Sequence, residues 1–126
     1  MVSIRQLGAE SFVAHNLSSP YREKVIQAFR QHKTPLRMDV ELPSLQAIKR
    51  FVTMGNGVAL LPEISVEDEI ARGELARIPV KELRLHRKLR LVYRKEGALS
   101  HAGRAFLKVA EAVAAERKGH YLFQRE

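Results

Sequence analysis

Leu36–Pro62, which reads LRMDVELPSLQAIKRFVTMGNGVALLP, decides the fold. Its first part, residues 36–42, alternates strictly between apolar and polar residues, which is typical of a half-buried strand. The next part opens with Pro43-Ser44 and predicts a helix, whose apolar stripe is Leu45, Ile48, Phe51 and Val52 and whose C-terminal cap is Gly55. Residues 57–61 then form an apolar run that predicts a central, buried strand.

The same order of strand and helix extends toward the N-terminus. Residues 11–15 (SFVAH) form a short run of β-type residues. Ser19 suits the N-cap of a following helix, and Pro20 suits its first helical position, where a missing N–H has no cost. Basic residues and Pro35 end that helix after about residue 33.

The pattern toward the C-terminus predicts further elements. A third helix starts near Pro62, with Ser65 and Asp68 spaced as a capping box. Residues 75–80 predict a fourth strand or an edge segment, and residues 88–94 predict another strand. A basic connection over residues 81–88 joins them. A last helix starts near Leu99, capped by Ser100 and ended by Gly119, before a loose tail over residues 120–126.

Alternating strands and helices predict an α/β fold with a mainly parallel sheet flanked by helices. In such folds the carboxyl ends of the strands meet the amino ends of the next helices, and ligands bind along that edge.

Composition excludes several classes of protein. The 126 residues are 45% apolar, too many for a disordered chain, and the apolar runs are too short for a membrane span or a secretory signal. The chain has no cysteine, which excludes disulfides and thiolate chemistry and favours a cytoplasmic location.

Catalytic and metal-binding patterns are missing from the sequence. No two of the five histidines are three or four residues apart, and no nucleophile-elbow motif occurs. The acidic cluster at residues 67–69 is explained by a helix start. We therefore expect no catalytic residues, no metal site and no cofactor, and the chain is not expected to be an enzyme.

Two polar helix starts are the best candidates for binding. One follows the strand at residues 11–15, and Leu42-Pro43-Ser44 follows the strand at residues 36–42. Free backbone N–H groups at a helix start attract carboxylate or phosphate groups. Simple capping explains the same residues, so both interpretations stay open at this point.

The ordered segments resemble one known family. Glu41–Pro62, Glu69–Val80, Leu89–Arg94 and Leu99–Leu107 resemble, in that order, the effector-binding domain of LysR-type transcriptional regulators. In that family a helix ends in a Gly-x-Gly turn, leads into an apolar strand and stops at proline. No single motif is diagnostic, but the ordered run covers nearly the whole chain.

The resemblance implies a periplasmic-binding-protein-like (type 2) fold, with two α/β lobes around an effector cleft. Residues 1–80 would form the second lobe, and residues 81–126 would supply the crossover strand and C-terminal helix of an incomplete first lobe. Since the family's winged helix-turn-helix, linker helix and first half of lobe one have no counterpart here, we expect a truncated fold. The uncovered apolar faces are expected to drive self-association into a dimer or higher oligomer.

The resemblance also implies a small-molecule effector-sensing and dimerisation module. The expected effector is a small anionic metabolite, DNA would be contacted only through the absent N-terminal domain, and no membrane contact is expected. The residues that match the family's cleft coincide with the helix starts named above: His15, Asn16, Ser18, Ser19, Pro20, Tyr21 and Ser44.

The charge distribution supports an alternative. The net charge is +8, of which residues 1–80 carry +1 and residues 81–126 carry +7. A stand-alone basic protein could bind nucleic acid through the 81–126 surface, with strong salt dependence. No recognition helix or basic stretch interleaved with aromatic residues accompanies this charge.

Overall fold

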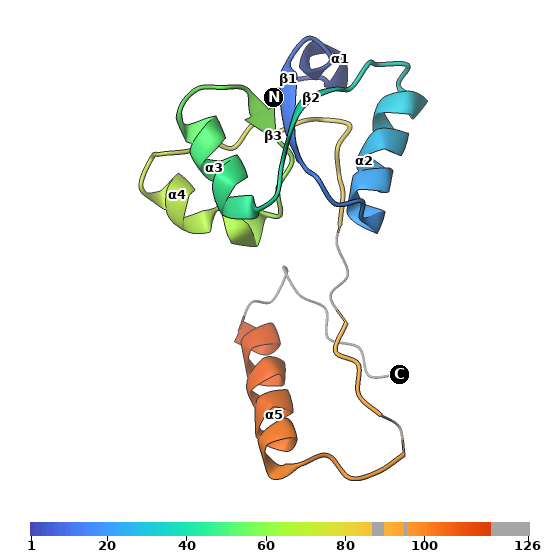
Figure 1. The fold of residues 1–126 in the computed structure, drawn as a ribbon, viewed down its shortest axis with the longest axis vertical. Coiled ribbons are helices and arrows are strands. Elements are labelled where there is room, and N and C mark those ends of the chain that lie inside the picture. Colours follow the sequence, from blue (N-terminus) through green and yellow to red (C-terminus); the bar gives the residue numbers. More distant parts are fainter. Residues whose placement is uncertain (87–89, 95, 117–126) are drawn as a thin grey trace. The chain divides into compact units, whose positions relative to one another are not determined.

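The computed structural model describes residues 1–86, 90–94 and 96–116. The chain divides into two compact units, Met1–Leu89 and Arg90–Glu126 (Figure 1). The first unit holds the sheet and most of the helices, and the second holds one long helix.

A three-stranded parallel sheet organises the first unit. Its strands are β1 (Ser11–His15), β2 (Arg37–Leu42) and β3 (Val58–Ala59), in the order β2-β1-β3. The predicted central strand at residues 57–61 is wrong in length and place: β3 has two half-buried residues and lies at the edge. Both neighbours pair with β1, so β1 is the central strand, and it carries the buried Phe12 and Val13.

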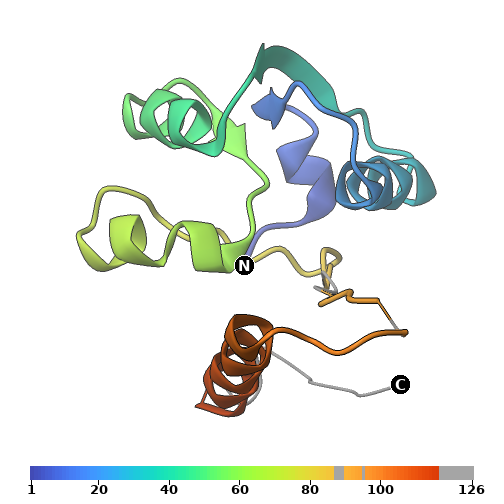
Figure 2. The ribbon, with the colours of Figure 1, turned by 60° about the horizontal axis from the view of Figure 1, so that its bottom comes forward.

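The two predicted helices after β1 and β2 are confirmed. They are α2 (Pro20–Gln31), with Ser19 as its N-cap, and α3 (Leu45–Thr53), with Ser44 as its N-cap. They lie on opposite sides of the sheet (Figure 2). Gly55 has a φ of +81° and donates to the Val52 carbonyl, while Asn56 donates to the Phe51 carbonyl, which makes the predicted glycine cap a Schellman motif.

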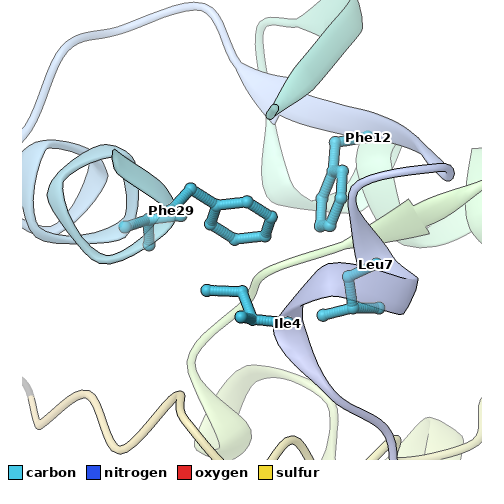
Figure 3. Close-up of a cluster of buried hydrophobic side chains, with 5 residues drawn as sticks. Ile4, Leu7, Phe12 and Phe29 are labelled. Atoms are coloured by element: carbon cyan, nitrogen blue, oxygen red, sulfur yellow. The ribbon is translucent and has the colours of Figure 1, made fainter. Parts of the chain in front are cut away.

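The main core lies between α2, β1 and a short helix, α1 (Ile4–Leu7), that sequence reasoning did not predict. Ser3 and Gln6 form a complete capping box at the start of α1. Figure 3 shows the rings of Phe12 and Phe29 meeting edge to face, with centroids 5.6 Å apart, beside Ile4 and Leu7. Val25 completes the buried cluster.

The chain after β3 is less regular than predicted. A 3₁₀ turn, η1 (Glu63–Ser65), leads into α4 (Glu67–Ala71). The capping box predicted from Ser65 and Asp68 is wrong, because the Ser65 hydroxyl donates instead to the Pro62 carbonyl at 2.7 Å within the 3₁₀ turn.

The strand predicted at residues 75–80 is also wrong. Only Val80 pairs, in an isolated parallel bridge with Val2. The Pro79 carbonyl accepts from the Val2 amide, and Pro79 has no N–H with which to extend a ladder. Farther along, Glu82 accepts from the Ile4 amide, and Leu83 and Leu85 pack against the core, so residues 80–85 belong to the first unit.

The second unit contains α5 (His101–Glu116), which confirms the predicted last helix and its cap, because Ser100 Oγ accepts from the Gly103 amide. Residues 90–94 form no strand, so the prediction there is wrong: no neighbouring strand pairs with them within the described residues. Positions 88 and 89 of that predicted strand, Gly119 and the tail at residues 120–126 lie outside the described residues. Along α5 the predicted apolar stripe is exposed at Phe106, Val109 and Val113.

A nearly buried ion pair fixes α4 to α3. Lys49 Nζ lies 2.6 Å from Glu69 Oε1 and also donates to the Ser65 carbonyl at 3.0 Å. The hydrogen bond from Lys49 holds the pKa of the Glu69 carboxyl below its ordinary value of 4.5.

This ion pair predicts acid sensitivity of the first unit. A carboxyl whose pKa is lowered by folding stabilises the folded state above its unfolded pKa, and the stabilisation is lost as the pH falls through the folded value. We expect the free energy of unfolding, measured by urea titration, to fall below about pH 4.5. Glu69→Gln should be less stable at pH 7 and should flatten this dependence. Part of the dependence should remain, because Arg72 also lowers the pKa of Glu74. An equal slope in both proteins would contradict the assignment.

Candidate effector-binding site

The carboxyl ends of β1 and β2 lie side by side. His15 and Leu42, the last residues of the two strands, are partners in the parallel register, and the Asn16 amide donates to the Leu42 carbonyl at 3.0 Å. The helices α2 and α3 begin a few residues beyond these ends. Both helix N-termini therefore lie along one edge of the sheet, as the sequence predicts.

Both candidate serines cap their helices. Ser19 Oγ accepts from the Arg22 amide at 3.1 Å, and Ser44 Oγ accepts from the Ala47 amide at 3.2 Å. The capping interpretation is therefore confirmed. Capping uses the Oγ atoms of these serines as acceptors, so their hydroxyl protons remain able to donate.

Arg22 joins the ends of both strands to the start of α2. One guanidinium nitrogen donates to the His15 carbonyl at 2.8 Å, and the other lies 2.6 Å from Glu41 Oε1. The Arg22 side chain is 23% exposed and that of Glu41 is 45% exposed, so this cation borders solvent. The sequence analysis did not identify Arg22 as a candidate binding residue. Its position could have indicated one, because an arginine three residues after the N-cap lies in the first turn of the helix.

The imidazole of His15 is oriented by the same turn. Its Nδ1 accepts from the Leu17 amide at 3.1 Å. In the neutral ring the proton then lies on Nε2, which makes Nε2 a donor.

The remaining predicted residues differ in exposure. Asn16, Ser18, Pro20 and Ser44 are exposed, whereas Ser19 and Tyr21 are half-buried. Tyr21 packs against the hydrophobic core. The contacts described above bring His15 and Ser19 together through Arg22. Ser44 caps the neighbouring helix instead, through its hydrogen bond with the Ala47 amide.

The strand order adds a feature that the sequence did not reveal. In the order β2-β1-β3, the strand β2 lies on one side of β1. The chain then crosses back, and β3 lies on the other side of β1. Parallel sheets bind ligands at such a switch point, outside the carboxyl ends of the strands. The half-buried Leu60 and Leu61, directly after β3, therefore border the same edge.

A groove of about 400 Å³ lies elsewhere, near the start of β3. It is lined by Val2, Gln6, Leu7, Glu10, Val58 and Ile78. Val58 opens β3 and Glu10 precedes β1, which places this groove at the amino ends of the strands, away from the two helix starts.

The described residues hold no cluster of His, Asp or Glu suited to a metal ion. Among the helices over residues 1–86 and 96–116, none is long and apolar enough to cross a membrane.

Comparison with known proteins identifies the family. The model of the LysR substrate binding domain matches residues 1–115. The uncharacterized HTH-type transcriptional regulator YeiE of Escherichia coli K12 is 32% identical over 106 residues, which are 84% of this chain and 36% of YeiE. The RuBisCO operon transcriptional regulator of Acidithiobacillus ferrooxidans is 30% identical over 105 residues, 83% of this chain and 34% of that protein.

A solved structure has the same fold. The regulatory domain of CcmR from Synechocystis PCC6803, in complex with 2-PG, matches with a TM-score of 0.70 and 25% identity, over 96% of this chain and 57% of the other. The chain spans about a third of the length of the two curated relatives named above. This likeness confirms the expected periplasmic-binding-protein-like α/β fold. Since the family model covers nearly the whole sequence, the chain belongs to the LysR substrate-binding domain family of transcriptional regulators.

Proposed function

We propose that this chain senses a small anionic metabolite at the carboxyl edge of β1 and β2. The observation that carries the proposal is the convergence of two helix N-termini and the Arg22 guanidinium at that edge. The proposed binding residues are Arg22 and the set predicted from the sequence, which is His15, Asn16, Ser18, Ser19, Pro20, Tyr21 and Ser44.

The electrostatics of the edge favour an anion. Each helix N-terminus acts as roughly half a positive charge and presents backbone N–H donors. Arg22 adds a guanidinium whose planar donors suit a carboxylate or a phosphate, although Glu41 offsets part of its charge. The Nε2 of His15 and the exposed Asn16 and Ser18 side chains supply further donors. The solved complex of the CcmR regulatory domain with 2-PG supports a small-molecule ligand for this fold.

The domain assignment belongs to the same proposal. Residues 1–80 correspond to the second lobe and residues 81–126 to the crossover strand and C-terminal helix of the first. In an intact regulator of this family, effector binding would change how the paired DNA-binding domains are placed relative to each other. This coupling requires that the effector bind one placement of the domains more tightly than the other. The role is regulatory rather than enzymatic, and the proposed location is the cytoplasm.

A thermal-shift titration tests the site. We expect 2-PG, or another member of a panel of small carboxylates and phosphates, to stabilise the chain by about 1.4 kcal/mol at about ten times its Kd, which is several degrees in Tm. Ser19→Asp keeps an N-cap acceptor but adds a negative charge, so it should abolish the shift while the protein stays folded.

The matched control is Ser100→Asp, which makes the same change at the cap of α5 in the other unit and should retain the full shift. No stabilisation by any member of the panel, or an undiminished shift in Ser19→Asp, would contradict the proposal.

Glu41 competes with the effector for Arg22 in this account. Its carboxylate already contacts the guanidinium, so an arriving anion has to share or replace it. We expect Glu41→Gln to tighten anion binding about fivefold, since one unit charge at about 4 Å in a solvent-like dielectric is worth about 1 kcal/mol. Isothermal titration with the anion found above measures this change. Asp39→Asn, two residues earlier on the same strand, is the control and should leave the affinity unchanged; equal or weaker binding by Glu41→Gln would contradict the competition.

We also propose that the chain self-associates. Phe106, Val109 and Val113 form an exposed apolar stripe on α5, and Leu91, Val92 and Tyr93 are exposed as well. Exposed apolar groups in such clusters mark interaction surfaces. Size-exclusion chromatography with light scattering tests this at micromolar concentration, and a strictly monomeric species would contradict it.

A further inference from the structure

The ion pair between Arg22 and Glu41 places a carboxylate beside the hydrogen-bond donors of the proposed binding edge. Those donors are the backbone amides at the starts of α2 and α3, the Arg22 guanidinium and the Nε2 of His15. Glu41 Oε1 lies 2.6 Å from the guanidinium. An effector that offers only acceptor atoms would match the donors but would meet the Glu41 carboxylate without a hydrogen bond.

Glu41 can accept a second hydrogen bond. Its Oε1 accepts from Arg22, and within the described residues its Oε2 remains available to another donor. The side chain of Glu41 is 45% exposed, because it lies at an outward-facing position of β2. A carboxylate that a ligand covers without supplying a donor weakens binding, since its desolvation is not compensated.

Arg22 can bind a carboxylate without releasing Glu41. One terminal nitrogen of its guanidinium donates to the His15 carbonyl at 2.8 Å, and the other donates to Glu41. The guanidinium has further N–H donors, so an arriving carboxylate can share it with Glu41. A donor on the carbon next to that carboxylate would then lie beside the Glu41 side chain.

The charge of the edge favours a neutral donor over a cationic one. Arg22 and Glu41 carry opposite charges, so the two helix N-termini leave the edge with about one net positive charge. An α-hydroxyl brings its donor without further charge. An α-ammonium would bring a positive charge close to both helix starts, which is unfavourable.

We propose that the effector is an α-hydroxy carboxylate, whose carboxylate binds Arg22 and whose hydroxyl donates to Glu41. Glu41 thereby determines specificity: it weakens the binding of anions that lack a donor and accepts from those that have one. The inference rests on the proposed function and narrows the class of anion that the same edge would bind.

Three dicarboxylates of equal length test the proposed class. Malate has a hydroxyl on the carbon next to one carboxylate, succinate has a hydrogen there, and aspartate has an ammonium group. We expect isothermal titration of the wild-type chain to show that one enantiomer of malate binds about tenfold more tightly than succinate, because its hydroxyl donates to a charged acceptor. Aspartate should bind no more tightly than succinate.

Glu41→Met tests whether Glu41 causes this preference. Methionine has a similar length but no strong acceptor, so malate and succinate should bind to this variant within about twofold of each other. This preference compares two ligands in one protein, so it is separate from the gain in affinity expected when the charge of Glu41 is removed. Asp39→Leu removes a carboxylate from the same face of β2 and should keep the preference of the wild type.

The outcomes separate this inference from the proposed function. Equal affinities of malate and succinate for the wild-type chain, or binding of other anions but not of malate, would overturn the class of effector and leave the binding edge in place. A preference for malate that persists in Glu41→Met would overturn the role of Glu41. If no small carboxylate or phosphate binds, the proposed function itself is wrong.

Discussion

Phe29→Ala is expected to lower the free energy of unfolding by about 3–5 kcal/mol. Phe29 is 1% exposed and packs edge to face on Phe12 across the interface between α2 and β1. The smaller side chain would leave a cavity that α1 and β1 cannot fill without moving. Urea denaturation followed by circular dichroism measures the loss.

Phe106→Ala is the matched control for this prediction. It makes the same chemical change on α5, where Phe106 is 62% exposed, so the stability of the first unit should stay within about 0.5 kcal/mol of the wild type. Similar losses from the two substitutions would show that the core does not lie where the structure places it.

Gly57→Ala is expected to destabilise the first unit by about 2–4 kcal/mol. Gly57 has a φ of +113°, and a Cβ built there would lie 2.6 Å from the Ser11 carbonyl oxygen. That oxygen belongs to the backbone of β1, the central strand, so the clash cannot be relieved by rotating a side chain. The substitution should separate β3 from β1.

Gly55→Ala is the control at the preceding glycine. Gly55 also has a positive φ, of +81°, but an added Cβ there would meet nothing within 4 Å. Only the backbone strain of about 1–2 kcal/mol remains. Denaturation curves that rank the Gly55 variant as the less stable of the two would contradict the close approach of β3 to β1.

Local signals in the sequence predicted the helix starts well. Ser19, Ser44 and Ser100 act as caps in the structure, because a cap depends only on the few residues around it. The same rule applied to Ser3 and Gln6 would have found α1, whose capping box is complete. The helix N-termini after β1 and β2, together with the alternation of strands and helices, predict the carboxyl edge of the sheet, which holds most of the candidate residues.

Pairing between distant segments could not be predicted in the same way. Residues 57–61 and 75–80 have the composition of strands, but a strand needs a neighbour, and only short parts of these segments have one. The contact between Arg22 and Glu41 likewise depends on the register of β2 against β1, which the sequence does not state. Packing across the sheet, rather than local propensity, decides these features.

Chemical-shift mapping of the ¹⁵N-labelled chain tests the central claim most directly. The protein would be titrated with the small anion that gives the largest thermal shift, beginning with 2-PG. We predict that amide signals of residues 16–19, 21–22 and 44–47 move together and saturate at one Kd, while those near Glu10, Ile78 and α5 stay fixed. Shifts confined to the groove beside β3, or no saturable shift with any anion of the panel, would contradict an effector site at the carboxyl edge.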